Sequence, residues 1–408
     1  MAVALADRLA FYTTTGMVLL LLATLALGLA AVAPDPPGAE PVIYSPLLLA
    51  LAVLAAVTAE VPVRRDAAVV ILTISGGLAF YVCTLVPGLR RFRLWVVAAL
   101  LIAAEAVIII RVPSPAHQDV WRFLDYGIDG MFKGQNPYSG TTVGADGGIF
   151  RLTYPPAALL LLAPFRLVLG DIRWGYLASQ AIVVALLPRL IRRRTGTLAR
   201  WQEALILMPL ALPRVSQAFF TFSNHEWVLL ALAAAALLLA LDSRAVWAGV
   251  VTGLGIAAKQ YFIVFPVLYL LPELRRRTLL VALGVAVAVT VPFVAWGPSM
   301  FIEHVFGNLT SAPNTDRLTL WAMLHNSGLP SGPAVSLGLA IAGAAVVVLL
   351  AWRARRDLSR SLMACGLGLV AFTLGATFAG YNYYVYALVF FTWGLMIPTA
   401  PSRLVKSD

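Results

Sequence analysis

Long apolar runs, separated by short polar segments, cover most of the chain. A helix needs about 20 mainly apolar residues to cross a bilayer, and most of the runs approach or reach that length. We therefore expect an all-α, polytopic transmembrane protein with about 13 spans. The expected spans are residues 10–33, 45–63, 67–86, 94–111, 172–190, 202–222, 227–241, 245–258, 261–271, 279–296, 334–352, 358–379 and a last span after residue 384.

Arginine clusters between the runs indicate which way the spans point. The clusters that follow residues 190, 271 and 352 fall on one side of the membrane when the spans are counted. Basic loops are typically cytoplasmic, so the segment 113–153 is expected on the outer face. The orientation of the first three spans stays open, because Arg64-Arg65 and Arg90-Arg91 flank the same span.

Composition and charge narrow the class of protein further. Of the 408 residues, 61% are hydrophobic and 12% are charged, which excludes a soluble enzyme. The net charge of +11 resides in the clusters between spans, so we expect contacts with anionic lipid and no nucleic-acid partner. Two cysteines in apolar runs and four histidines without ligand spacing give no reason to expect a disulfide, a metal or a cofactor.

The chain is expected to form one integral membrane domain with three parts. Residues 1–111 form the N-terminal transmembrane helices, and residues 112–171 form an outer loop. Residues 172–408 form a transmembrane helical core that includes a long outer loop at 297–332.

The stretch 117–138 predicts an amphipathic helix that lies along the membrane surface. At helical spacing its polar residues share one face and its apolar residues share the other. Such a helix buries its apolar side among lipid headgroups. The polar face holds Asp119, Arg122, Tyr126, Asp129 and Lys133, and the apolar face holds Trp121, Leu124, Ile128, Met131 and Phe132. Asn136-Pro137-Tyr138 ends the helix, since proline disfavours a helical residue before it.

A second apolar segment begins at Tyr154-Pro155-Pro156 and reaches Gly170. It is shorter than a span and is interrupted by Pro164 and Arg166, so we expect it to be re-entrant or interfacial. The stretch between the two segments, residues 140–153, is expected to be a polar loop.

The outer polar residues suggest transfer chemistry. A carboxylate can accept the proton of a sugar hydroxyl that attacks, and cations can neutralise a phosphate leaving group. No P-loop, Rossmann glycine motif or Ser/His/Asp set is present at usable spacing. From the residues alone, the expectation is an outward-facing polar pocket in a helical membrane protein. The candidate site residues are Asp119, Arg122, Asp125, Asp129, Tyr154, His225, Glu226, Lys259 and His325.

Four motifs in this region resemble the first outer loop of GT-C membrane glycosyltransferases. They are Asp119-x-x-Arg122, Gly134-x-Asn136-Pro137-Tyr138, Tyr154-Pro155-Pro156 and Ala163-Pro164. The similarity is greatest to bacterial polyprenol-phosphate-mannose-dependent mannosyltransferases. The chain departs from simpler members by placing four spans, where those have one, before this loop.

The resemblance implies a fold and a function. It implies a GT-C-like architecture in the bacterial plasma membrane with the active site on the extracytoplasmic side. Asp119 takes the place of the catalytic base, and Lys259, in the segment 257–261, resembles the lysine of a short helical hairpin. The donor would be a polyprenyl-phosphate sugar, with mannose expected, and the acceptor a glycolipid, polysaccharide or protein. Transfer would invert the anomeric centre without a metal.

Other interpretations of the same residues stay open. Asp119 could cap the interfacial helix, Asp125 and Asp129 could be solvated surface residues, and Lys259 could extend to lipid headgroups. The protein could instead be a transporter, a lipid flippase or a non-catalytic scaffold of envelope synthesis. A transporter would require charged residues near the bilayer midplane, where Glu105 stands in an apolar run.

Overall fold

The computed structural model describes residues 76, 78–111, 119–139, 141–143, 149–211, 226–260, 262, 265, 277–310, 319–354, 357–375 and 381–397. Within these residues the chain is helical apart from one short β-hairpin. The elements are η2 (Arg90–Phe92), α5 (Arg93–Arg111), α6 (Asp119–Phe132), β1 (Thr141–Val143), β2 (Ile149–Arg151), α7 (Ala157–Leu169), α8 (Arg173–Thr195), α9 (Arg200–Ala211), α11 (Glu226–Leu241), α12 (Ala245–Ile256), α13 (Arg277–Trp296), α14 (Pro298–Thr310), α15 (Leu320–Asn326), α16 (Pro333–Ala354), α17 (Leu358–Gly375) and α18 (Tyr381–Met396).

Four described helices are long and apolar enough to cross a bilayer: α5 together with η2, α8, α13 and α17. They correspond to the expected spans 94–111, 172–190, 279–296 and 358–379. The helices α11 and α12 are apolar but shorter. The expected spans 10–33 and 45–63 lie outside the described residues, as do half of 67–86 and most of 261–271, so the total of about 13 stays a prediction.

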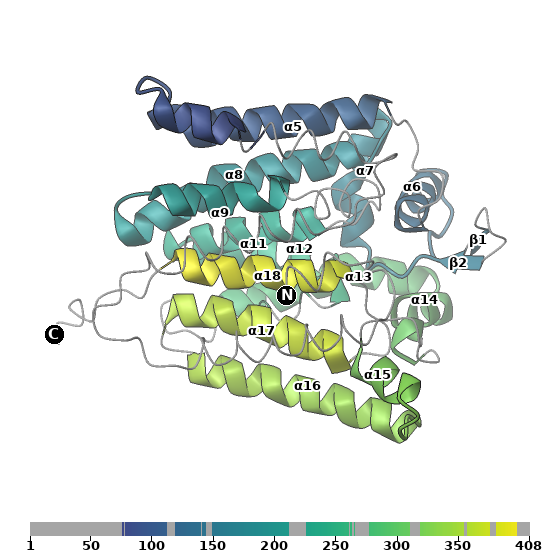
Figure 1. Cartoon of the computed structure of the whole chain (residues 1–408). Helices are drawn as coiled ribbons and strands as arrows, with labels where there is room; N and C mark the ends of the chain where they lie inside the picture. The colour runs from purple at the N-terminus through teal and green to yellow at the C-terminus, as the bar shows by residue number, and fades with distance from the viewer. Residues whose placement is uncertain are drawn as a thin grey trace.

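The long helices lie side by side, and shorter elements cover one end of the bundle (Figure 1). At that end α7 runs across the direction of α8, and α6, the hairpin, α14 and α15 gather beside it. Helix α7 has 13 residues, about 20 Å, which is too short to cross a bilayer core of about 30 Å. This length fits a segment that does not cross the bilayer, and its re-entrant or interfacial placement stays a prediction.

Three details of this end differ from expectation. The segment 140–153 was expected to be a loop, but it contains the antiparallel pair β1 and β2, with Thr142 opposite Phe150. The expected outer loop 297–332 contains α14 and α15, and residues 381–384, expected to be a turn, are the first residues of α18. In each case local backbone hydrogen bonding replaces the irregular structure that the polar composition suggested.

Helix α6 forms where the amphipathic pattern predicts it, but protein covers the middle of its apolar face, while Phe132 at its end is exposed. Leu124 and Ile128 are fully buried and belong to the hydrophobic core. Gly127 lies beside Leu152 and Leu159, because a Cβ on the glycine would come within 3.0 Å of the Leu159 side chain. The expectation that this face rests among lipid headgroups is therefore wrong for these residues.

Helices α12 and α13 approach each other closely at two glycines. A Cβ on Gly249 would lie 2.7 Å from the Thr278 carbonyl oxygen, and one on Gly253 would lie 2.5 Å from that of Ala282. The two glycines are four residues apart and so lie on one face of α12. Small residues at this spacing let helix backbones pack together inside a membrane. This packing holds the end of α12, and with it Lys259, in a fixed place.

Candidate functional site

The Asn136-Pro137-Tyr138 corner anchors the segment that leads into α7. The Asn136 Oδ1 atom accepts a hydrogen bond from the Tyr138 backbone N–H at 2.9 Å. The buried Tyr138 hydroxyl donates to the Tyr154 carbonyl oxygen at 2.9 Å. The Tyr138 ring packs edge-on against Phe301, with 4.9 Å between ring centroids. The Asn136-Pro137-Tyr138 motif therefore holds the backbone of Tyr154 in place through the Tyr138 hydroxyl.

The start of α7 is also tied to the end of α12. The Ala157 backbone N–H donates to the Ala257 carbonyl oxygen at 2.9 Å. The Gln260 side-chain amide donates to the carbonyl oxygens of Thr153 and Val305, at 2.7 and 2.9 Å. These bonds bring the Tyr-Pro-Pro turn, the Lys259 turn and α14 together, although they are far apart in the sequence.

A buried ion pair lies at the centre of this junction. The Lys259 Nζ atom is 2.7 Å from Glu226 Oε1, and the two side chains are 1% and 0% exposed. The ammonium also lies 5.1 Å from the centroid of the Tyr154 ring, within the range of a cation–π interaction. Burial lowers the pKa of Lys259, and the neighbouring Glu226 carboxylate opposes that shift. The alternative that Lys259 extends to lipid headgroups is wrong, because its ammonium points into the protein.

The carboxylates of α6 belong to a second polar group. The guanidinium of Arg166 lies 2.8 Å from Asp125 Oδ1 and 3.0 Å from Asp129 Oδ2. Asp125 is buried, and burial raises its pKa to about 6, although the nearby Arg166 acts in the opposite direction. The alternative that Asp125 is a solvated surface residue is therefore wrong. The substrate-binding role expected for both carboxylates requires Arg166 to share them with a ligand.

A third polar group joins the start of α8 to α6. The Arg173 guanidinium lies 2.6 Å from Asp171 Oδ2, and the other carboxylate oxygen of Asp171 accepts from the Trp121 indole N–H at 3.4 Å. Trp121 stands two residues after Asp119, so this contact fixes the first turn of α6. Tyr176, three residues after Arg173 on the same face of α8, is fully buried.

The remaining expected site residues are placed as follows. Asp119 is the first residue of α6, but its side chain lies outside the described part of the chain, as does His225. Arg122 is half-buried on α6. His325 is exposed on α15, where it stacks on Trp321 and its Nδ1 lies 3.0 Å from Ser331 Oγ. These described contacts of His325 lie within α15 and the turn after it.

Several residues of the site were not expected from the sequence. Arg166 stood out as an interruption of an apolar segment, and this was the signal that it pairs with buried carboxylates. Tyr138 and Gln260 gave no such signal, because an uncharged side chain in a motif does not reveal its partner. Among the residues that the structure describes, no three His, Cys, Asp or Glu side chains are grouped to hold a metal ion.

A bundle that contains four membrane-length apolar helices, with buried charged groups at one end, is typical of a polytopic membrane protein. Residues 152–377, more than half of the chain, match glycosyltransferase family 87, and the chain belongs to this family. It is also similar to an alpha-(1->3)-arabinofuranosyltransferase of Corynebacterium glutamicum, with 28% identity over 212 residues. That match covers 49% of this chain and 50% of the relative, so the chain spans about half the length of the curated relative. No solved structure matches this chain.

The family membership confirms the glycosyltransferase resemblance. A glycosyltransferase requires a sugar donor and an acceptor. Tyr154, Glu226, Lys259 and His325 fall within the matched residues, whereas Asp119, Arg122, Asp125 and Asp129 precede them.

Proposed function

We propose that the chain transfers a sugar from a polyprenyl-phosphate donor to a glycolipid, polysaccharide or protein acceptor at the outer face of a bacterial plasma membrane. The observation that carries the proposal is the position of Lys259. It is a buried cation beneath the Tyr154-Pro155-Pro156 turn, within the residues that match glycosyltransferase family 87. A cation at this place can neutralise the charge that develops on a phosphate leaving group.

The reaction is a single displacement. An acceptor hydroxyl oxygen forms the new bond to the anomeric carbon, and its proton passes to the Asp119 carboxylate. The bond between the anomeric carbon and the phosphate oxygen breaks, and the phosphate leaves with the electron pair. Attack from the face opposite the phosphate inverts the anomeric centre. Arg122 and Lys259 hold the phosphate, and Tyr154, which stacks on the ammonium, limits access to it.

Glu226 determines when Lys259 can act. In the structure the ammonium is already neutralised by this carboxylate at 2.7 Å. A donor phosphate therefore has to share the ammonium or displace Glu226, and it must first reach a side chain that is 1% exposed. Donor binding thus requires the Tyr-Pro-Pro turn, held by Tyr138 and Gln260, to move away from Lys259.

The donor sugar has two candidates. Mannose follows from the resemblance of the outer-loop motifs to mannosyltransferases. Arabinofuranose is favoured by the relative from Corynebacterium glutamicum, whose name is that of an arabinofuranosyltransferase. The leaving group is the same polyprenyl phosphate for both sugars. The proposed roles of Asp119 and Lys259 are therefore the same for either donor.

A transfer assay tests the proposal. Membranes that contain the chain, and matched membranes without it, are given radiolabelled polyprenyl-phosphate mannose or polyprenyl-phosphate arabinofuranose. Label should pass to a lipid, polysaccharide or protein acceptor only where the chain is present, and one donor should be strongly preferred. Equal transfer in both membranes with either donor would refute the proposal.

A further inference from the structure

A second charged region lies at the end of the bundle opposite the candidate site. Helix α8 begins at Arg173, beside the site, and carries Arg189, Arg192 and Arg193 near its other end. Arg173 and Arg193 are separated along the helix by about 30 Å, at 1.5 Å per residue. This is the thickness of a bilayer core, so the two polar ends of α8 stand at the depths of the two headgroup layers.

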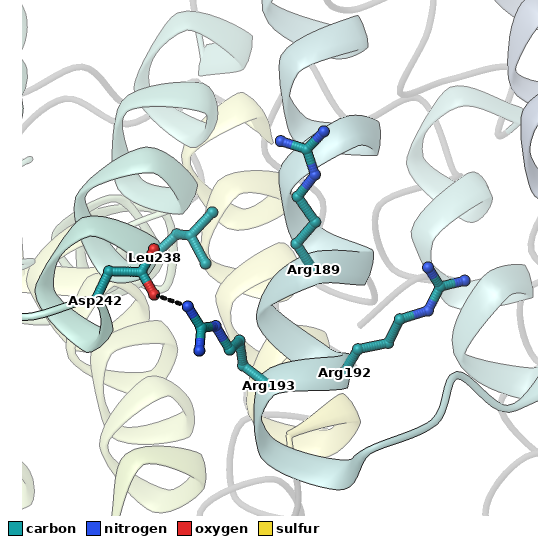
Figure 2. Close-up of a pocket in the computed structure, with 5 residues that line it drawn as sticks. All are labelled: Arg189, Arg192, Arg193, Leu238 and Asp242. Atoms are coloured by element: carbon teal, nitrogen blue, oxygen red, sulfur yellow. Dashed lines mark hydrogen bonds and ion pairs between the residues drawn. The ribbon is translucent and has the colours of Figure 1, made fainter.

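The second end contains a pocket. It has a volume of about 420 Å³ and is lined by Arg189, Arg192, Arg193, Leu238 and Asp242. Its walls come from the last turns of α8 and of α11 (Figure 2). A volume of this size is in the range of small-molecule sites and exceeds what a single phosphate ion fills.

The charges in the pocket are unbalanced. Arg193 lies 2.6 Å from Asp242, and that pair is exposed, at 64% and 28%. Arg189 and Arg192 make no ion pair with any residue that the structure describes. Figure 2 shows Arg189 one turn from Arg193, while Arg192 extends in another direction. Arg189 and Arg193 are four residues apart and share a helix face, so their guanidinium groups can reach one ligand between them.

We propose that this pocket binds the phosphate of an anionic membrane phospholipid. Guanidinium groups bind phosphate oxygens through paired, charge-assisted hydrogen bonds. Leu238 supplies an apolar wall for the glycerol and the start of the acyl chains. Basic pockets between transmembrane helices on the cytoplasmic side are sites of this kind for anionic headgroups. The arginines also offset the partial negative charge of two helix ends, but three guanidinium groups and one carboxylate leave positive charge for a ligand.

Lipid binding to the purified full-length chain in detergent tests the proposal. Native mass spectrometry would measure the affinity for phosphatidylglycerol, with zwitterionic phosphatidylcholine as the comparison lipid. The Arg189→Gln/Arg193→Gln variant should bind phosphatidylglycerol about tenfold more weakly or worse, as expected for lost hydrogen bonds to a charged group. Arg200→Gln is the matched control, because Arg200 is exposed on α9 near the same end and does not line the pocket.

Three results would overturn the proposal. The first is an equal loss of phosphatidylglycerol binding in Arg200→Gln, which would show a general effect of surface charge. The second is equal affinity for phosphatidylcholine. The third is complete displacement of the lipid by millimolar inorganic phosphate, which would make the free ion the ligand.

A second variant keeps the test decisive if the double variant fails to fold. Asp242→Asn removes the carboxylate that competes for Arg193, and both side chains of that pair are exposed enough for stability to change little. Affinity for phosphatidylglycerol should rise severalfold. Unchanged or reduced affinity in a folded Asp242→Asn chain would contradict the site.

Discussion

Lys259 and Glu226, 33 residues apart in the sequence, form an ion pair of 2.7 Å in which both side chains are almost completely buried. Glu226 is the first residue of α11, and Lys259 follows the end of α12. The pair therefore joins two helices directly beneath Tyr154. In the proposed mechanism, its position links the stability of this end of the bundle to the binding of a phosphate donor.

Removal of one partner of this pair should be strongly destabilising. Lys259→Met leaves the Glu226 carboxylate buried without its cation, and the cost of breaking such a pair is about 3–5 kcal/mol. The Lys259→Met/Glu226→Met double variant removes both charges and should recover most of that loss. Unfolding in detergent, followed for the single and double variants, gives the comparison. A double variant no more stable than the single one would show that the two side chains do not depend on each other.

Asp125 should make stability depend on pH. Its pKa is about 6 in the folded chain, above the ordinary value of 3.8, so the folded state binds this proton more tightly. The stabilisation is complete below about pH 4 and is lost as the pH rises through about 6; it amounts to at most about 3 kcal/mol. The difference in melting temperature between pH 5 and pH 7 should therefore be smaller in Asp125→Asn than in the unaltered chain. An identical pH dependence in the variant and the unaltered chain would contradict the raised pKa of Asp125.

Gly253→Ala should weaken the packing of α12 on α13. The added Cβ would lie 2.5 Å from the Ala282 carbonyl oxygen, so the two backbones must separate. Overpacking of this kind typically costs about 1–3 kcal/mol. Gly284→Ala on α13 is the control, because its Cβ would meet nothing within 4 Å. Melting temperatures of the two variants should differ by several degrees; equal values would mean that the helices do not meet at Gly253.

The outer placement of α6 can be tested with a single cysteine. Ser139 is exposed just after the Asn-Pro-Tyr corner, and both native cysteines are buried. A Ser139→Cys chain in intact cells should react with a membrane-impermeant thiol reagent, whereas Arg200→Cys should react only after permeabilisation. The reverse result would place the candidate site on the cytoplasmic side.

The sequence predicted the features that depend on neighbouring residues, and it did not predict contacts between distant segments. The run 172–190 predicted α8, because the thickness of a bilayer sets the length of an apolar helix. The pattern around Leu124 and Ile128 predicted α6, but not that α7 would cover it. The approach of Lys259 to Glu226 depends on how α11 and α12 pack, and no local pattern records that packing.

The same reasoning explains the errors. Arg166 broke an apolar segment, but its pairing with Asp125 and Asp129 was not expected, because the crossing of α6 over α7 is a tertiary feature. The hairpin around Thr142 and Phe150 was missed, since a short strand pair in a polar, glycine-containing stretch has a weak sequence signal. Contacts between distant segments, rather than helix formation, account for what the sequence did not reveal.

The most direct test of the proposed mechanism is the turnover of Asp119→Asn. Asparagine keeps the size of the side chain but cannot accept the proton of the acceptor hydroxyl, and a general base contributes about 10²–10⁴-fold to rate. The purified variant should fold and bind donor normally, yet transfer the sugar at least about a hundredfold more slowly. Asp129→Asn, in which the altered residue contacts Arg166, should lose much less. Near-normal turnover of well-folded Asp119→Asn, or a larger loss in Asp129→Asn, would contradict the mechanism.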